Sequence, residues 1–166
     1  MADYYGTEAG ADDYHDARGN TAWAAGSSPD KLAALTRASQ YIDGRGQCDG
    51  LSLFPGTKTG GRAQVLVWPR TGAVDWSGAA ILPDEVPVEV QFATYEAALR
   101  ELAAPGSLNP DYVPAQQVKR EKVDVLETEY VGAAEGVNPV RPVVSVVMDM
   151  LAPVMTPCVS PAIYTV

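Results

Sequence analysis

His15 is the only histidine of the chain, and Asp12, Asp13 and Asp16 surround it. On a helix, Asp12 would share a face with His15 or Asp16, because residues three or four positions apart are neighbours. Imidazole and carboxylate groups arranged in this way could hold a divalent ion weakly. The alternative is an acidic helix face in solvent, which the N-terminal end of the helix dipole stabilises. We favour the acidic face and predict neither a metal site nor a cofactor.

A second candidate for chemistry is the segment of residues 56–61 (GTKTGG), which resembles a phosphate-binding loop in composition. That motif needs a lysine directly after a glycine and a helix behind it, and neither requirement is met here. No nucleophile elbow and no zinc-ligand spacing occurs in the sequence. The carboxylate pairs Asp84-Glu85 and Glu127-Glu129 have no histidine partner. The sequence therefore predicts no catalytic residue, and we expect the chain not to be an enzyme.

Length and composition predict one loop-rich domain. The 166 residues are 46% hydrophobic, which suffices for a modest core. Fifteen glycines and thirteen prolines are spread along the chain, so many residues should lie in turns. Cys48 and Cys158 define no disulfide framework, and we expect a reduced compartment. There is no signal-peptide pattern and no apolar run of roughly 20 residues, so no membrane contact is expected.

The charge balance disfavours nucleic acid as a partner. Twelve basic residues stand against 21 acidic ones, which gives a formal net charge of -9. The resulting field repels a phosphate backbone, and no cluster of lysine and arginine compensates for it locally. The most basic stretch, residues 119–122 (KREK), is short, and acidic residues follow it. We interpret it as the charged edge of a hairpin, where such residues discourage unwanted strand pairing.

Periodicity and capping residues predict a mainly α fold, a small bundle of about four helices. The first helix is expected over residues 7–18 and ends at Gly19. The second is capped by Ser28, has Pro29 in its first turn and ends before Gly44. Its buried face should consist of Leu32, Leu35, Ala38 and Ile42.

The third helix should supply the centre of the core. Asp84 is expected to cap it, Pro87 lies in its first turn, and residues 105–106 should end it. Its apolar residues recur at steps of three and four as the stripe Val88, Phe92, Tyr95, Leu99 and Leu102. The fourth helix should start near residues 138–139 and stop at Pro153. Its apolar face would comprise Val143, Val144, Val147, Met148 and Leu151.

Residues 44–82 show no helical period and are predicted to form a long loop. Loops of this length are uncommon in compact domains and are usually functional. Within this segment, residues 68–72 (WPRTG) join an indole to a rigid proline and a turn glycine. Trp68 should anchor the loop on a helix, and Arg70 should pair with a buried or interfacial carboxylate. We predict both as partner-binding residues.

Residues 117–130 alternate apolar and charged side chains and predict a β-hairpin that turns near residues 123–125. We expect the hairpin to project from the domain. Its basic residues Lys119, Arg120 and Lys122 are predicted to contact a neighbouring subunit or a partner protein.

The helical domain is predicted over residues 1–155, and residues 156–166 (TPCVSPAIYTV) are predicted as an extended C-terminal arm. The arm has no charged side chain, and Pro157 and Pro161 exclude a helix. Its apolar side chains would be exposed without a partner surface. The alternative is that the arm lies on the helices of its own chain. We expect it to leave the domain and to dock on another protein through Val159, Ile163, Tyr164 and Val166.

Several motifs, taken in order, resemble one protein family. They are residues 13–20 (DYHDARGN) followed by Trp23, residues 31–43 (KLAALTRASQYID), residues 68–72, the helix entry at residues 81–87, and the strand pair at residues 119–123 and 129–130. In this order and spacing they are similar to the head-tail adaptor, or connector, proteins of long-tailed bacteriophages. Similar sequences also carry the label DnaT-like single-stranded-DNA-binding protein. The segment of residues 47–61 departs from the family pattern, because it is longer and richer in glycine.

The resemblance implies a structural virion protein at the head-tail junction, assembled in the host cytoplasm. Such subunits form a ring of about twelve copies, a dodecamer. The ring binds the portal protein above and a stopper or tail-completion protein below, and it leaves a channel for genome ejection. With an acidic channel wall, DNA would pass without specific binding. The alternative function is a single-stranded-DNA-binding replication accessory protein, which the net charge and the lack of interleaved basic and aromatic residues disfavour.

Overall fold

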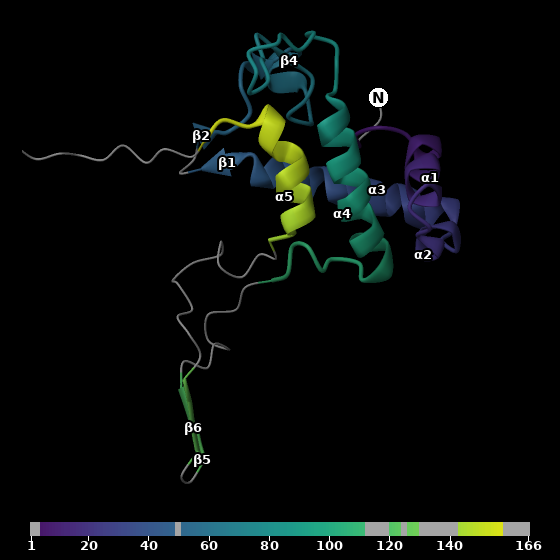
Figure 1. Cartoon of the computed structure of the whole chain (residues 1–166), viewed down its shortest axis with the longest axis vertical. Helices are drawn as coiled ribbons and strands as arrows, with labels where there is room; N and C mark the ends of the chain where they lie inside the picture. Colours follow the sequence, from purple (N-terminus) through teal and green to yellow (C-terminus); the bar gives the residue numbers. More distant parts are fainter. Residues whose placement is uncertain (1–3, 49–50, 112–119, 124–125, 130–142, 158–166) are drawn as a thin grey trace, which may run out of the picture.

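A computed structural model describes residues 4–48, 51–111, 120–123, 126–129 and 143–157 (Figure 1). The predicted fold class is confirmed, because the described residues form a mainly helical bundle with a long loop and a small hairpin. The helices are α1 (Glu8–Asp16), α2 (Thr21–Ala24), α3 (Ser28–Arg45), α4 (Val88–Ala103) and α5 (Ser145–Leu151), with short 3-10 turns η1 (Gly61–Ala63) and η3 (Ala152–Val154). The strands are β1 (Gln47–Cys48), β2 (Leu51–Ser52), β3 (Thr57–Lys58), β4 (Arg70–Thr71), β5 (Arg120–Val123) and β6 (Leu126–Glu129).

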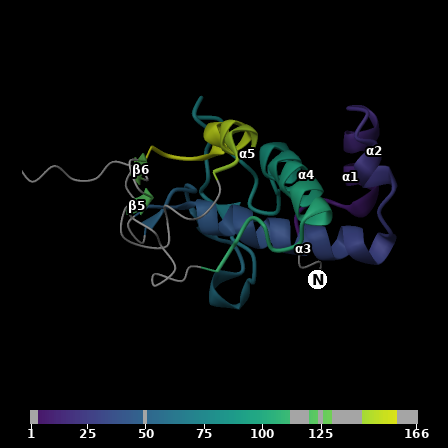
Figure 2. The same ribbon diagram turned by 90° about the horizontal axis from the view of Figure 1, so that it is seen from below.

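The long helices α3 and α4 pack against each other at the centre of the bundle. Helix α5 packs on α4 on one side, and α1 and α2 lie on the other (Figure 2). None of the described helices combines the length and the apolar character needed to cross a bilayer.

Local capping signals set where the first helices begin. Thr7 caps α1, because its hydroxyl accepts a hydrogen bond of 2.9 Å from the Gly10 amide. Ser27, one residue earlier than predicted, caps α3 by accepting from the Asp30 amide, with Pro29 in the first turn. The four-residue helix α2 was not predicted, and it buries Trp23 beside α1.

The expected cap of α4 by Asp84 is wrong. The helix begins at Val88, and Pro87 occupies the position before it with an extended backbone. A proline disfavours the helical conformation of the residue that precedes it, here Val86. Val86 therefore stays outside the helix, which begins after Pro87.

The predicted core stripe of α4 holds only in part: Tyr95 is buried, and Leu99 and Leu102 are partly buried against the core. Phe92 is 39% exposed and Val88 is 49% exposed. The buried residues of this helix are Val90, Ala93, Thr94, Tyr95, Ala97, Ala98 and Glu101. Small side chains let two helix backbones approach closely, and this packing selects the alanine-rich face rather than the one with the largest side chains. On α3 the prediction holds better, since Leu35, Ala38 and Ile42 are fully buried.

The predicted long loop is irregular, as expected, but several short antiparallel contacts organise it. Strand β1 pairs with β2, and β3 pairs with β4. A further bridge joins Val74 to Ala80. The loop is therefore a fixed structure of its own, attached to the end of α3.

The predicted hairpin is confirmed as the antiparallel pair β5 and β6, in which Val123 lies opposite Leu126. In Figure 1 this pair lies apart from the helices. Helix α5 buries Val147 and Leu151 and ends before η3, which contains Pro153, so the predicted stop is confirmed. The predicted start of this helix near residues 138–139 lies outside the described residues, as does the arm beyond Pro157.

Candidate functional site

A buried polar anchor fastens the long loop to α3 and to the N-terminal segment. The Tyr5 hydroxyl donates to Asp43 Oδ1 and accepts from the Trp68 amide at 3.1 Å, while the Val67 amide donates to Asp43 Oδ2 at 3.1 Å. The Tyr5 amide donates to Ser39 Oγ at 2.9 Å. Burial raises the pKa of both the Tyr5 phenol and the Asp43 carboxyl. The anchor joins the N-terminal segment, α3 and the long loop, which are distant in sequence. Its polar atoms bond to one another.

Arg70 lies inside the long loop, and its partners differ from the predicted carboxylate. Its guanidinium is buried and donates to the carbonyl oxygens of Pro55 (2.6 Å), Phe54 (3.1 Å) and Val67 (3.4 Å). An irregular loop leaves carbonyls without strand partners, and the five donors of an arginine can satisfy several of them at once. Burial lowers the pKa of the guanidinium.

Trp68 is buried and packs edge-on against Phe54 of the same loop, with 5.7 Å between ring centres, so the predicted anchoring of Trp68 on a helix stays a prediction. The use of Trp68 and Arg70 as partner contacts stays a prediction.

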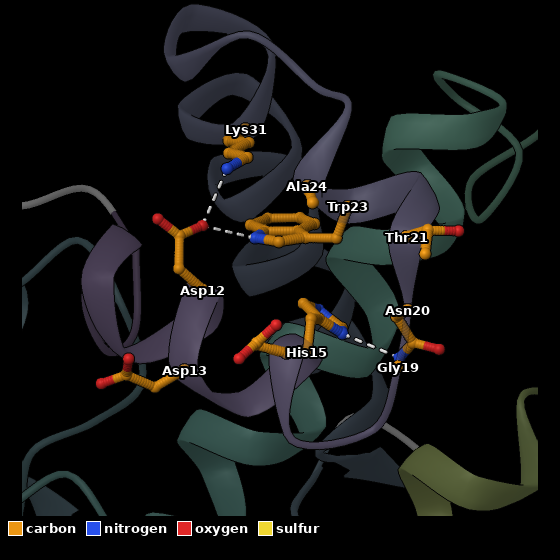
Figure 3. Close-up of a pocket in the computed structure, with 10 residues that line it drawn as sticks. Asp12, Asp13, His15, Gly19, Asn20, Thr21, Trp23, Ala24 and Lys31 are labelled. Carbon is orange, nitrogen blue, oxygen red and sulfur yellow. Dashed lines mark hydrogen bonds and ion pairs between the residues drawn. The ribbon is translucent and has the colours of Figure 1, made fainter.

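A polar pocket of about 400 Å³ lies between α1 and α2 and borders His15 (Figure 3). Asp13 and Asp16 are exposed, as expected for an acidic face in solvent, whereas the His15 side chain is only 1% exposed. Its Nε2 lies 3.1 Å from the Tyr95 carbonyl oxygen, and its Nδ1 lies 3.0 Å from Asn20 Nδ2. A carbonyl only accepts, so Nε2 carries the proton and Nδ1 accepts from Asn20. Burial lowers the pKa of this imidazole, which is therefore held neutral.

Asp12 faces away from His15 and is occupied by other partners. Its Oδ1 accepts from Trp23 Nε1 at 2.7 Å and from Lys31 Nζ at 2.8 Å (Figure 3). The hydrogen bond from Lys31 is the main cause that lowers the pKa of this carboxyl. Within the described part of the chain, no group of three or more His, Cys, Asp or Glu side chains could hold a metal ion. The hydrogen bonds of Asp12 thus join α1 to α2 and to α3.

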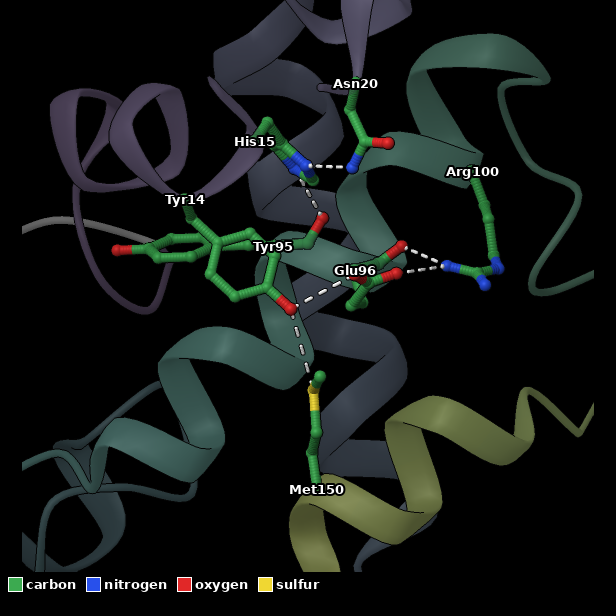
Figure 4. Close-up of polar contacts among 7 residues, drawn as sticks. All are labelled: Tyr14, His15, Asn20, Tyr95, Glu96, Arg100 and Met150. Atoms are coloured by element: carbon green, nitrogen blue, oxygen red, sulfur yellow. Dashed lines mark hydrogen bonds and ion pairs between the residues drawn. The ribbon is translucent and has the colours of Figure 1, made fainter. Parts of the chain in front are cut away.

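A second polar cluster connects α1, α4 and α5 (Figure 4). The Tyr14 hydroxyl donates to Glu96 Oε1 at 3.0 Å and lies 4.0 Å from Met150 Sδ. Glu96 also forms an ion pair of 3.0 Å with Arg100, one turn along the same helix. These contacts are structural, because each group finds its partner within the bundle.

Nearly all basic side chains of the described bundle and long loop are held by partners inside the chain. Three form ion pairs: Lys31 with Asp12 (2.8 Å), Arg37 with Glu101 (2.8 Å) and Arg100 with Glu96 (3.0 Å). The others lie over tyrosine rings or donate to backbone carbonyl oxygens: Arg18, Arg45, Lys58 and Arg70. Arg62 is exposed. A phosphate backbone therefore meets few free cations on this part of the surface.

An apolar groove of about 390 Å³ opens between the N-terminal segment, the long loop and the entry to α4. Tyr4, Val65, Leu66, Pro69 and Val86 contribute to its walls, and none of its lining residues is charged. Val65 is 73% exposed. One sequence signal pointed to this groove, the short apolar run at residues 63–68 (AQVLVW). From the sequence we interpreted this run only as part of the long loop.

A rigid turn presents Trp76 to solvent. The Asp75 carboxylate accepts from the Ser77 amide (2.8 Å), the Ser77 hydroxyl (2.7 Å) and the Ala79 amide (2.9 Å), and the first cause of its lowered pKa is the Ser77 side chain. The Trp76 amide donates to the Pro153 carbonyl at 2.9 Å, which fixes the turn to the end of α5. The indole itself is 76% exposed. Sequence reasoning missed this residue, although the segment DWSG has the composition of a turn.

The remaining predicted partner-binding residues have different outcomes. Arg120 and Lys122 lie on β5, opposite Glu129 and Glu127 of β6. The others fall outside the described residues: Lys119, Val159, Ile163, Tyr164 and Val166. Their roles stay predictions.

Comparison with known proteins identifies the family. No curated protein and no solved structure matches the chain. The sequence model of one family matches residues 1–164, and its description agrees with the second label carried by similar sequences, that of a DnaT-like protein. Because this match covers almost the whole length, the chain belongs to the family described as "Putative DnaT-like ssDNA binding protein".

Proposed function

We propose that the chain is a structural subunit of a virion, a head-tail adaptor that forms a ring between the portal protein and a stopper or tail-completion protein. In this role it has no catalytic activity, and DNA passes through the ring without specific binding. The observation that carries the proposal is the composition of the described surface, where apolar side chains are free and basic ones are engaged.

The basic side chains support a role other than DNA binding. A protein that binds phosphates needs free lysine and arginine, and single-stranded DNA also needs aromatic platforms beside them. Here ion pairs and carbonyl contacts occupy the side chains of Lys31, Arg37, Arg70 and Arg100. With a formal net charge of -9, the free charges are mainly acidic.

The exposed apolar side chains support a protein partner. Trp76 stands on a preorganised turn, and tryptophan dominates many protein interfaces. Because hydrogen bonds already hold the backbone of this turn, the turn loses little conformational freedom when a partner binds. Val65 and Leu82, which are 73% and 61% exposed, add apolar area on the same long loop. If the chain is a phage adaptor, as its sequence resemblance implies, the portal protein or the stopper protein would cover this apolar area.

The test is assembly with the portal protein of the same virus. The two proteins are mixed, and the mass of the complex is measured by light scattering. We expect a ring on the portal for the natural chain, a loss of at least tenfold in affinity for Trp76→Ala, and no loss for the control Val143→Ala, whose residue is also exposed. A natural chain that never associates with the portal would refute the adaptor function.

The family description favours a second candidate, a single-stranded-DNA-binding replication accessory protein. An exposed indole such as Trp76 could stack on a base. In that case the chain would bind single-stranded DNA at physiological salt, with an affinity that falls as salt rises and that Trp76→Ala weakens. Trp76→Ala thus separates the two functions: it weakens portal binding if the chain is an adaptor, and it weakens binding to single-stranded DNA if the chain is a replication accessory protein.

A further inference from the structure

We propose that the apolar groove receives the C-terminal segment, residues 158–166, of a neighbouring copy, so that successive copies are joined head to tail. The inference rests on the proposed function, because it names the contact that would close the ring. The occupant is a second copy of this chain rather than the portal or the same molecule.

The groove is preformed and uncharged. The Gln64 side chain fixes its floor, since its Oε1 accepts from the Gly60 amide at 2.8 Å and its Nε2 donates to the Leu66 carbonyl at 2.9 Å. Lys58 donates to the carbonyl oxygens of Gln64 and Val65 and holds the same turn from outside the groove. A groove that needs no rearrangement binds its occupant at lower entropic cost.

The wall of the groove also contains an unused donor. Trp68 lines the groove, and its Nε1 is buried without a hydrogen-bond partner among the described residues. A buried donor without an acceptor is costly. A peptide backbone supplies a row of carbonyl acceptors, whereas a purely apolar occupant supplies none.

The C-terminal segment has matching chemistry. Residues 158–166 contain no charged side chain and four large apolar ones, Val159, Ile163, Tyr164 and Val166. An uncharged segment suits a groove that no charged residue lines, since neither side has to strip water from an ion. Pro161 favours an extended backbone, the form in which carbonyls are free to accept.

The start of the segment is fixed, and this sets its reach. The Thr156 amide and hydroxyl both bond to the Leu53 carbonyl, at 2.7 and 2.8 Å. Nine residues beyond Pro157 span at most about 30 Å, at roughly 3.3 Å for each residue. That length is comparable to the diameter of a small domain, so the segment can reach an adjacent copy.

The segment and the groove are separate features, as a contact between neighbouring copies requires. In Figure 1 the described chain behind α5 leads to β2, where Thr156 bonds to Leu53, whereas the groove is built from the N-terminal segment, residues 59–69 and Val86. Because the segment and the groove are different parts of the surface, a segment of one copy in the groove of the next makes a heterologous contact, which closes into a ring when the rotation fits.

The experiment uses three full-length variants. Val65→Asp places a charge in the groove, Ile163→Asp places one in the segment, and Val143→Asp is the matched control, because Val143 is 69% exposed but does not line the groove. Self-association is followed by analytical ultracentrifugation. We expect the groove and segment variants each to associate about tenfold or more weakly than the natural chain, and the control to behave like it.

Mixing the two defective variants gives the decisive result. Val65→Asp keeps a good segment and Ile163→Asp keeps a good groove, so one junction can form and the mixture should yield a complex of two chains. A mixture that stays monomeric while the natural chain associates would overturn the proposal, as would Val65→Asp behaving like the control.

A peptide titration covers the case in which the natural chain does not associate by itself. A synthetic peptide of residues 156–166 is added to the Ile163→Asp chain, and the amide NMR signals of Gly60, Val65 and Leu66 are followed. We expect saturable shifts below about 1 mM peptide. An absence of shifts would refute the inference, as would groove signals in the monomeric natural chain that already match the peptide-bound state, which would place the segment in its own groove.

The outcome also separates the inference from the proposed function. Portal binding that survives in a chain whose groove takes no peptide would leave the adaptor function standing and remove the junction. If copies associate through the groove but the chain never binds the portal, the junction stands and the adaptor function is refuted.

Discussion

Replacing Glu101 by alanine is expected to destabilise the fold by about 2–4 kcal/mol, because it removes the acceptor of one buried amide and of two partly buried donors. The Glu101 carboxylate is 1% exposed and accepts three hydrogen bonds. Its Oε2 accepts from Arg37 Nε at 2.8 Å and from the Gly106 amide at 2.7 Å, and its Oε1 accepts from the Leu108 amide at 2.9 Å. One side chain therefore joins α3 to the turn that follows α4.

The magnitude follows from what alanine leaves behind. The Leu108 amide is buried and loses its acceptor, and such an unsatisfied group costs about 1–3 kcal/mol. The Gly106 amide is exposed enough for water to replace the acceptor, so it adds no more than about 1 kcal/mol. Arg37 is 36% exposed, so water can replace its partner, and this part adds no more than about 1 kcal/mol. The total is a large fraction of the roughly 5–15 kcal/mol by which domains are stable.

The assay is urea unfolding at neutral pH with Glu89→Ala as the control. Glu89 lies in the first turn of the same helix and is only partly buried, so its loss should change the free energy of unfolding by about 1 kcal/mol or less. Glu101→Gln keeps one acceptor oxygen for the Leu108 amide and should fall between the two. A loss below about 1 kcal/mol for Glu101→Ala, with an unchanged slope in urea, would refute the reasoning.

Four further outcomes follow from the same contacts. Phe92→Ala should cost only about 1–2 kcal/mol, because Phe92 is 39% exposed and contacts the rings beside it only partly, whereas Ile42→Ala should cost about 2–5 kcal/mol; equal losses in urea unfolding would contradict this. The pKa of His15 is lowered by burial, so its contribution to stability should be complete above about pH 6.5 and should be lost as the pH falls; His15→Phe should flatten this part of the pH profile, and an unchanged profile would contradict it. Deleting residues 119–129 should leave thermal unfolding of the helical body unchanged and block assembly with the portal, and normal assembly would exclude the hairpin as a contact. Binding to single-stranded DNA at physiological salt should be negligible in fluorescence anisotropy, and micromolar affinity would favour the second candidate function.

The sequence predicted those features that depend on neighbouring residues. Helix starts and stops follow from hydroxyl caps, prolines and glycines within a few positions, and for this reason the stop of α5 at Pro153 was predicted, as was α3, although its cap is Ser27 and it runs past Gly44 to Arg45. The hairpin also succeeded, because alternation is visible within one short segment. The start of α4 was placed wrongly because Pro87 acts on the residue before it, an effect that outweighed the capping signal of Asp84.

The buried face of α4 could not be inferred from one helix alone. Two faces of this helix have a regular period, one with large apolar residues such as Phe92 and one with alanines. Which of them is buried depends on how closely α3 approaches, and that is a property of the pair. Hydrophobicity favoured the large residues, whereas close packing selected the small ones.

Buried polar residues were missed for a related reason, and they bear directly on function. Glu101 and Arg37 are 64 positions apart, and Asp43 and the Val67 amide are 24 apart, so no local pattern connects them. Each such pair removes a charge or a donor from the surface. Because each ion pair takes one charge of each sign, the formal net charge of -9 still sets the sign of the surface field. A ring built from such subunits would repel DNA along its channel, and apolar contacts would have to hold it together against its own charge.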